Sequence, residues 1–135
     1  MLRWFSVILF FLISSTVSFG QFSDEEQRQI DILNTIINNP ESHDTSLASS
    51  YVELSGILYI SNLDTVMPLC AKAQEIAEKA LESRPSSPIA NSLLKALAGA
   101  INNIGYIYEQ QGDIPLALEY YHKSLALLEE VGNKK

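Results

Sequence analysis

The stretch NIGYIYEQQGDIPLALEYYHKSL, residues 103–125, places small residues at regular intervals among tyrosines and leucines. Gly105 lies within an apolar pattern of helical spacing, where glycine costs about 1 kcal/mol of helix stability relative to alanine. The usual compensation is close approach of a neighbouring helix, since a missing side chain lets two backbones come together. Ala117 and Ser124, seven residues apart, indicate the same for the helix after the Gly-Asp turn. The stretch therefore predicts a helical hairpin in which small and large residues interlock.

The rest of the chain beyond residue 20 also has helical periodicity and contains no alternating run that would predict a strand. We expect an all-α fold of five antiparallel helices. Their starts are expected at Ser23 with a capping box to Glu26, at Asp44 or Thr45, at Asp64 or Thr65, at the pair Ser87-Pro88, and at Asp113. Pro40 is expected to end the first helix, and Gly112 and the pair Gly132-Asn133 to end the last two.

Each helix carries one apolar stripe that is expected to be buried. In chain order the stripes are Ile30, Leu33 and Ile37; Leu47, Tyr51, Leu54 and Leu58; Val66, Cys70, Ala73, Ala77 and Ala80; Leu93, Leu97, Ile101, Ile104 and Tyr108; and Ala117, Tyr121, Ser124, Leu128 and Val131. Further apolar residues lie on other faces of the last helix: Leu116, Leu118, Leu125 and Leu127. Stacked helical hairpins usually end in a polar capping helix, so this helix is expected to need a further partner.

The second hairpin resembles a tetratricopeptide repeat (TPR). The residues that carry the resemblance are Ile104, Gly105, Tyr108, Gly112, Asp113, Ala117 and Tyr121, with Ser124 where the family prefers alanine. The first motif position is Ile101 instead of an aromatic residue, and the closing proline is absent. A weaker copy precedes it, with Leu54, Ser55, Val66, Cys70 and Ala73 in the matching places. The two copies are 50 to 51 residues apart, which exceeds the family's repeat of about 34 residues.

The resemblance implies an α-solenoid of two helical hairpins, preceded by a packing helix. The expected organisation is a signal peptide over 1–20, a leading helix and loop over 21–43, a degenerate TPR-like hairpin over 44–84 and a TPR hairpin over 85–135. The repeat-packing residues are then Leu54, Ser55, Val66, Ala73, Ile104, Gly105, Tyr108, Gly112, Ala117, Tyr121 and Ser124.

The first twenty residues have the layout of a secretory signal peptide. Arg3 precedes an apolar run, and Ser18 and Gly20 place small residues at the −3 and −1 positions of a cleavage site. The alternative is a retained membrane anchor, but the run is shorter than the about 20 apolar residues that a spanning helix needs. We therefore expect an exported protein, periplasmic or extracellular, whose membrane contact is limited to the signal peptide or a missing C-terminal region.

The chain has a formal net charge of −7, which cleavage at this site would change to −8 because Arg3 is lost. An acidic surface disfavours binding to nucleic acid, since phosphate neutralisation requires a basic patch. The single cysteine, Cys70, lies on an apolar stripe and is expected to be buried and inert. His43 and His122 are isolated, and no phosphate-binding glycine loop or nucleophile elbow occurs. We expect no cofactor, no metal and no enzyme activity; an accessory hydrolase with an unrecognised site is the alternative.

What the resemblance implies about function is protein binding, with a peptide or partner surface held in a concave groove. Asn102, Asn103 and Tyr106 are similar in placement to the residues that contact peptides in this family. Tyr106 and Tyr120 lie off the packing stripes and are the expected aromatic anchors, the alternative being an ordinary solvated helix face. Two forms of the function are open: the sensing scaffold of a longer signal-transduction protein, or a small adaptor that completes its solenoid by homodimerisation through the last helix or by docking on a partner.

Overall fold

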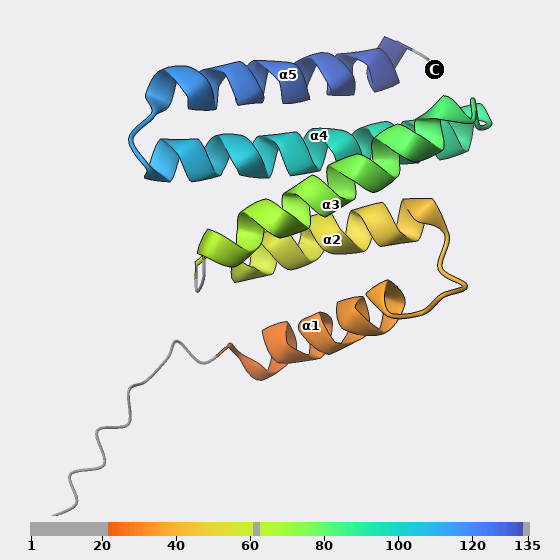
Figure 1. The fold of residues 1–135 in the computed structure, drawn as a ribbon, viewed down its shortest axis with the longest axis horizontal. Helices are drawn as coiled ribbons and strands as arrows, with labels where there is room; N and C mark the ends of the chain where they lie inside the picture. Colours follow the sequence, from red (N-terminus) through yellow and green to blue (C-terminus); the bar gives the residue numbers. More distant parts are fainter. Residues whose placement is uncertain (1–21, 61–62, 134–135) are drawn as a thin grey trace, which may run out of the picture.

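The computed structural model describes residues 22–60 and 63–133, which form an all-α fold (Figure 1). The five helices are α1 (Asp24–Ile37), α2 (Asp44–Leu58), α3 (Leu63–Glu82), α4 (Ser87–Gln110) and α5 (Ile114–Asn133), and these residues contain no strand. The predicted signal peptide lies outside the described residues. No helix in the described part of the chain is long and apolar enough to cross a membrane.

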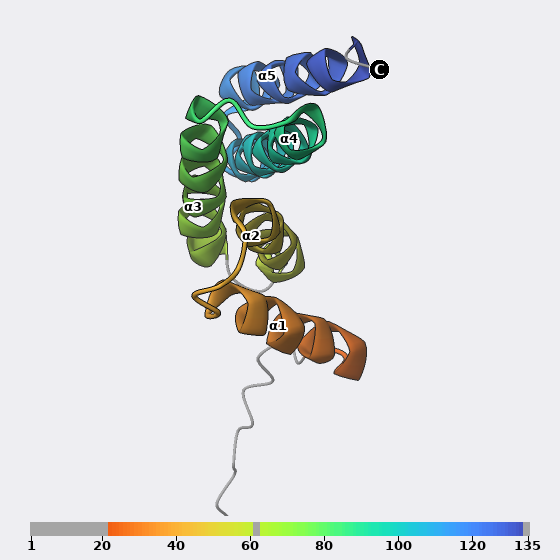
Figure 2. The same ribbon diagram turned by 90° about the vertical axis from the view of Figure 1, so that its right-hand side faces the viewer.

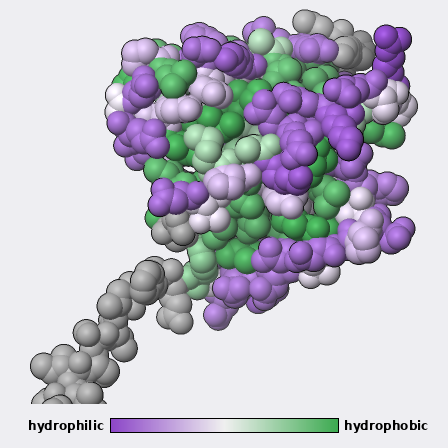
Figure 3. Space-filling view, in the orientation of Figure 1, coloured by the Kyte–Doolittle hydropathy of each residue, from purple (hydrophilic) through white to green (hydrophobic). Residues whose placement is uncertain are grey.

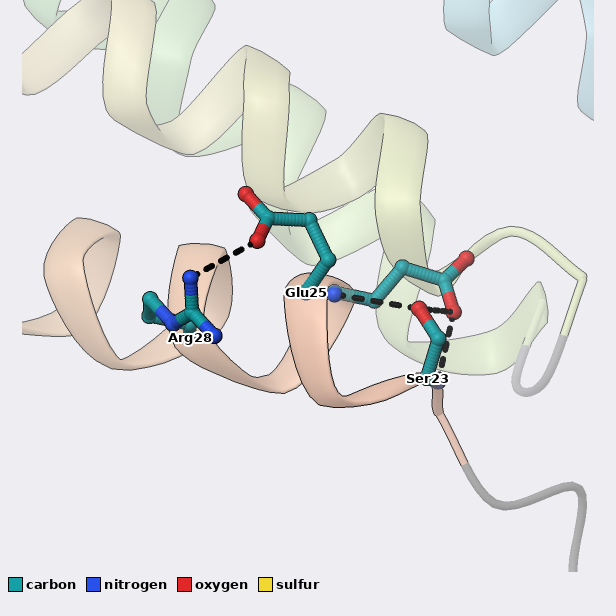
Figure 4. Close-up of polar contacts among 4 residues, drawn as sticks. Ser23, Glu25 and Arg28 are labelled. Atoms are coloured by element: carbon teal, nitrogen blue, oxygen red, sulfur yellow. Dashed lines mark hydrogen bonds and ion pairs between the residues drawn. The ribbon is translucent and has the colours of Figure 1, made fainter.

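The start of α1 is the capping box that the sequence predicts. The Ser23 backbone N–H donates to the Glu26 carboxylate at 2.8 Å, and the Glu26 backbone N–H donates to Ser23 Oγ at 3.2 Å (Figure 4). The Ser23 backbone N–H, and with it the Ser23 hydroxyl that donates to the same carboxylate at 2.8 Å, lower the pKa of Glu26. One turn further on, Arg28 forms an exposed ion pair with Glu25 at 3.0 Å.

The other helix ends follow the sequence to within a few residues. The cap of α4 is Ser86, one residue before the predicted Ser87, so Pro88 is still accommodated in the first turn. Gly112 has the left-handed φ of +82° expected of a helix end. Asp113 Oδ1 then accepts from the Leu116 N–H at 3.2 Å at the start of α5. The last helix, α5, ends at Asn133, within the predicted pair Gly132-Asn133.

The helices pack mainly against their neighbours in the sequence. By backbone proximity, α1 packs on α2, α2 on α3, α3 on α4 and α4 on α5, and α2 also packs directly on α4. Figure 2 shows the result: α1, α2, α4 and α5 follow one another along the molecule, and α3 lies to one side of α2 and α4. Successive helices run in alternating directions (Figure 1). The fold is therefore a layered stack whose central element is α4.

The core consists of two clusters that share α4 and a third, smaller one beneath it. The first two contain Ala48, Ala77, Leu93, Ala96, Leu97 and Ile101, and Val66, Cys70, Ala73, Ala100, Ile104 and Ile107. The third joins α1 to α2 through Ile30, Leu33 and Leu54. Ala73 and Ala77 are completely inaccessible, so the small residues of α3 lie where the stack is tightest.

Most of the predicted repeat-packing residues are in the packed regions. The buried ones are Leu54, Ser55, Val66, Ala73, Ile104, Gly105, Ala117 and Ser124, whereas Tyr108 and Tyr121 are half-buried and Gly112 is exposed in the turn. Leu128 corrects the predicted stripe of α5, because its side chain is 46% exposed. Ser124 and Val131 turn towards the core, and Leu128 lies at the edge of the face that they define.

The small residues of α4 and α5 allow two close helix approaches. A Cβ at Gly105 would lie 2.9 Å from the ring of Tyr121 and 3.2 Å from the Ala117 carbonyl oxygen, so the predicted approach of α5 is confirmed. A Cβ at Gly99 would lie 2.9 Å from Val52 on α2, an approach that the sequence analysis missed. Between α4 and α5, buried Ser124 Oγ donates to the Ala98 carbonyl at 2.8 Å, which joins the two helices by a polar contact.

Several large apolar side chains remain on the surface. Four of them lie along α5, each about half exposed: Ile114, Leu118, Leu125 and Leu128. We call these four residues the α5 stripe. Elsewhere, apolar residues appear in the middle of the face that Figure 3 presents, between polar residues at its upper and lower edges. Scattered exposed leucines need no explanation, but an aligned row on one helix indicates a contact surface.

Candidate functional site: a tyrosine-lined cavity

A cavity of about 360 Å³ lies where α2, α3, α4 and α5 meet. Its lining residues are Gly56, Tyr59, Val66, Asn102, Asn103, Tyr106 and Tyr121. Three of the four predicted binding residues, Asn102, Asn103 and Tyr106, are therefore brought together by α4. Since aromatic rings combined with a few polar groups are typical of binding pockets, this cavity is the candidate site.

Tyr59 and Tyr106 form the wall on one side of the cavity. Their ring centroids are 5.0 Å apart and the planes make an angle of 81°, which is the edge-to-face arrangement that aromatic pairs prefer. The same two rings also line a second hollow of about 330 Å³, together with Ile60, Leu63 and Gln110. The tyrosine pair thus separates two neighbouring depressions, and an extended segment crossing it has a depression on each side.

Tyr121 closes the cavity on the side of α5. Its hydroxyl donates to the Glu109 carboxylate at 2.5 Å. Burial, the bond to Glu109 and the negative charge of that carboxylate raise the pKa of Tyr121 to about 12, with a smaller contribution from Tyr106. The Tyr121 hydroxyl therefore remains protonated and donates to Glu109, which is held next to the cavity by this bond.

Two glycines give the cavity its shape. Gly105 lets the Tyr121 ring lie directly against α4, because a side chain there would occupy the same space. Gly56 acts in the opposite way: a Cβ built on it has no neighbour within 4 Å. The α2 side of the cavity is therefore open backbone, and bulk added at Gly56 would enter the cavity without a clash.

Asn102 and Asn103 have different environments although they are adjacent. Asn103 Nδ2 donates to Ser55 Oγ at 2.9 Å, and that hydroxyl in turn donates to the Val52 carbonyl at 2.7 Å. Ser55 is fully buried, so this pair is a polar contact between α4 and α2 inside the packing. Asn102 is exposed, and its side chain makes no hydrogen bond with any residue that the structure describes. Asn102 is therefore the amide that a ligand can reach.

Tyr120 does not line the cavity, which corrects the prediction that it lies on the same face as Tyr106. Its ring stacks on Tyr108, with centroids 5.3 Å apart and an interplanar angle of 27°, and packs against both large core clusters. Lys123 Nζ lies 5.1 Å from the ring centroid. Neighbouring residues of a helix point about 100° apart, so Tyr121 and not Tyr120 reaches the cavity.

The sequence pattern does not indicate Gly56, Tyr59 and Val66 as cavity residues, and it indicates only a packing role for Tyr121. One signal was available: Gly56 lies directly after Ser55, so it occupies the position in the first copy that Tyr106 occupies in the second. When one copy of a repeat has glycine at the position where the other copy has tyrosine, the glycine leaves room for the tyrosine ring. Tyr59 comes at the end of α2, where periodicity carries no information.

The other reactive residues do not form a second site. Cys70 is fully buried, as predicted, and burial raises the pKa of its thiol, an effect that the neighbouring Ser55 hydroxyl partly offsets. His43 and His122 are exposed and lie in different helices or caps. In the part of the chain that the structure describes, no group of three or more histidine, cysteine or acidic residues is placed to hold a metal ion.

Comparison with known proteins gives no match: no family model, no curated protein and no solved structure is significantly similar to this chain.

Proposed function

We propose that this chain is a protein-binding module that holds an extended segment of a partner protein in the tyrosine-lined cavity. The observation that carries the proposal is the joining of Tyr59, Tyr106 and Tyr121 with the exposed amide of Asn102 in one cavity. Aromatic side chains supply much of the binding energy at protein interfaces, and a free amide can hydrogen-bond a peptide backbone. The tyrosine pair between two depressions suits a linear segment better than a compact small molecule.

The wider arrangement is consistent with a TPR-like solenoid. The pairs α2–α3 and α4–α5 are hairpins of sequential helices, and α4 packs on both helices of the first pair. Such a pattern, in which each hairpin rests on the one before it, is what repeat stacking requires. Together with the signal-peptide pattern of residues 1–20, it supports an exported scaffold rather than an enzyme.

The proposal is tested by selecting random linear peptides on the purified protein and measuring their affinity for three variants. Gly56→Leu fills the cavity, Gly56→Ala changes the backbone propensity alone, and Ala71→Leu adds the same leucine to an exposed position on α3. We expect the selected peptides to bind Gly56→Leu at least about tenfold more weakly, corresponding to about 1.4 kcal/mol. Unchanged affinity for all three variants would show that the peptides bind elsewhere, and the cavity would then have no part in the function.

A second candidate concerns the α5 stripe. The four residues of the stripe are spaced by four, seven and three residues, which fits the alternating three- and four-residue steps of a seam between two helices. Read in the opposite direction, the spacing still fits alternating steps of three and four, so two copies of α5 can pair antiparallel. We propose a second copy of the chain as the occupant if the protein acts as a small adaptor. If it is instead the sensing part of a longer signalling protein, a further helix of the same chain takes that place, and the intact mass from the native cell distinguishes the two.

A further inference from the structure

We infer that the residue which enters the tyrosine-lined cavity is a basic one, an arginine or lysine of the partner segment. This inference is based on the proposed function and specifies its ligand. Three observations lead to it: the aromatic faces that line the cavity, the carboxylate held beside it, and the lack of positive charge on its walls.

Three aromatic rings line the cavity. Tyr59 and Tyr106 stand edge to face, and Tyr121 approaches from α5. The face of an aromatic ring carries partial negative charge, which attracts a guanidinium or ammonium group placed over it. Rings set at an angle of 81° present differently directed surfaces to the same space, so one cation can contact more than one of them while its aliphatic stem packs on the ring edges.

The surroundings of the cavity are negatively charged. Glu109 is tied to the Tyr121 hydroxyl at 2.5 Å and therefore adds a negative charge next to the cavity. Among the described residues that line this cavity or the adjoining hollow, none is lysine or arginine. The nearest cation along α5, Lys123, forms an ion pair with Glu119 at 2.6 Å. The formal charge of the whole chain, −7, has the same sign and favours a basic partner.

The cavity also offers a hydrogen-bond acceptor. The exposed Asn102 side chain offers a carbonyl oxygen, which is an acceptor for the N–H groups of a guanidinium. An acidic side chain in the same place would meet the negative ring faces, and the Glu109 carboxylate bonded to Tyr121 would repel it. A purely aliphatic side chain would leave the Asn102 amide without a partner when it excludes water. A basic side chain is therefore the anchor that can interact with the ring faces, the negative charge and the Asn102 acceptor together.

The test uses three capped pentapeptides, acetyl-Gly-Gly-X-Gly-Gly-amide, in which X is arginine, norleucine or glutamate. Their binding is measured by nuclear magnetic resonance from the chemical shifts of the tyrosine rings and of the Asn102 side-chain amide. We expect the arginine peptide to bind about fivefold more tightly than the norleucine peptide, which has a similar stem without the charge. Added salt should weaken the arginine peptide alone, and the glutamate peptide should bind least.

Glu109→Gln provides a matched variant, because it removes the charge and keeps a hydrogen-bond acceptor for Tyr121. It should reduce the preference for arginine over norleucine and leave the melting temperature near that of the parent. Equal binding of arginine and norleucine, or shifts with none of the three peptides, would overturn the basic anchor. Peptides selected on the parent that still lose affinity on Gly56→Leu would then leave the protein-binding function standing, so the two proposals fail separately.

Discussion

The ring of Tyr121 lies against the backbone of Gly105, with 2.9 Å between the position that a Cβ would take and the nearest ring carbons. This contact serves two purposes. It brings α5 close to α4, and it holds the tyrosine where its hydroxyl reaches Glu109 and its ring lines the cavity. Packing and the candidate site are thus joined through one glycine.

Gly105→Leu should disrupt the fold. The new side chain meets the Tyr121 ring and the Ala117 carbonyl, so α5 must move away from α4, at a cost of about 3 kcal/mol in the free energy of unfolding. Chemical denaturation measures this loss. Gly56→Leu is the matched control, since it adds the same side chain to a helical glycine with no neighbour within 4 Å. Equal stability of the two variants would contradict the close-approach argument.

Asn102→Ala should weaken peptide binding, whereas Asn103→Ala should lower the stability of the fold. Removing the Asn103 amide leaves the buried Ser55 hydroxyl without its donor and should lower the free energy of unfolding by about 1–2 kcal/mol. Removing the exposed Asn102 amide should leave stability unchanged and weaken peptide binding. Parallel denaturation curves and binding titrations of the two variants separate these effects. If both variants change stability alike, the assignment of Asn102 to the ligand is wrong.

Tyr121 should lose its proton later than an ordinary tyrosine in an alkaline absorbance titration. Its pKa is raised to about 12 from 10.0, which means that the folded protein holds this proton more tightly than the unfolded chain does. The resulting stabilisation is fully present below pH 10 and is lost as the pH rises through about 12. Tyr121→Phe should remove the late phase of the titration. A late phase that persists in this variant would assign the shifted pKa to another tyrosine.

The α5 stripe should control self-association if a second copy covers it. Leu118→Glu combined with Leu125→Glu places charges on the seam and should convert a dimer to a monomer, as measured by light scattering during size-exclusion chromatography. Ala71→Glu, an exposed position on α3, provides the control for added charge. A parent protein that is monomeric at every concentration would rule out the second copy as occupant.

Periodicity and small-residue spacing predict a large part of this fold. The five helices, the capping box at Ser23, the turn at Gly112 and the close approach at Gly105 all follow from local pattern, because each depends on residues near one another in the chain. Leu128 shows the limit. A helix can place it at the centre or the edge of a stripe, and the rotation of α5 that Ser124 and Val131 impose decides in favour of the edge.

The cavity could be predicted only in part. Asn102, Asn103 and Tyr106 come from one helix, so their spacing places them together. Gly56 comes from α2 and Tyr59 directly follows this helix, more than forty residues earlier, and their position depends on how α2 meets α4. The exchange of Tyr120 for Tyr121 has the same cause. The sequence pattern places Tyr121 on the packing stripe and Tyr120 off it, and only the packed orientation of α5 shows that the Tyr121 ring lines the cavity whereas Tyr120 packs against the core.

The packing of α4 on both α2 and α3 bears on how the chain folds. Every close helix pair is either adjacent in the sequence or separated by a single helix, so the chain closes only short loops on its way to the native state. Proteins with such low contact order fold quickly. Since α1 adjoins α2 alone among the described helices and buries only Ile30 and Leu33, its amides should exchange with solvent first, through openings that leave α4 and the tyrosine-lined cavity intact.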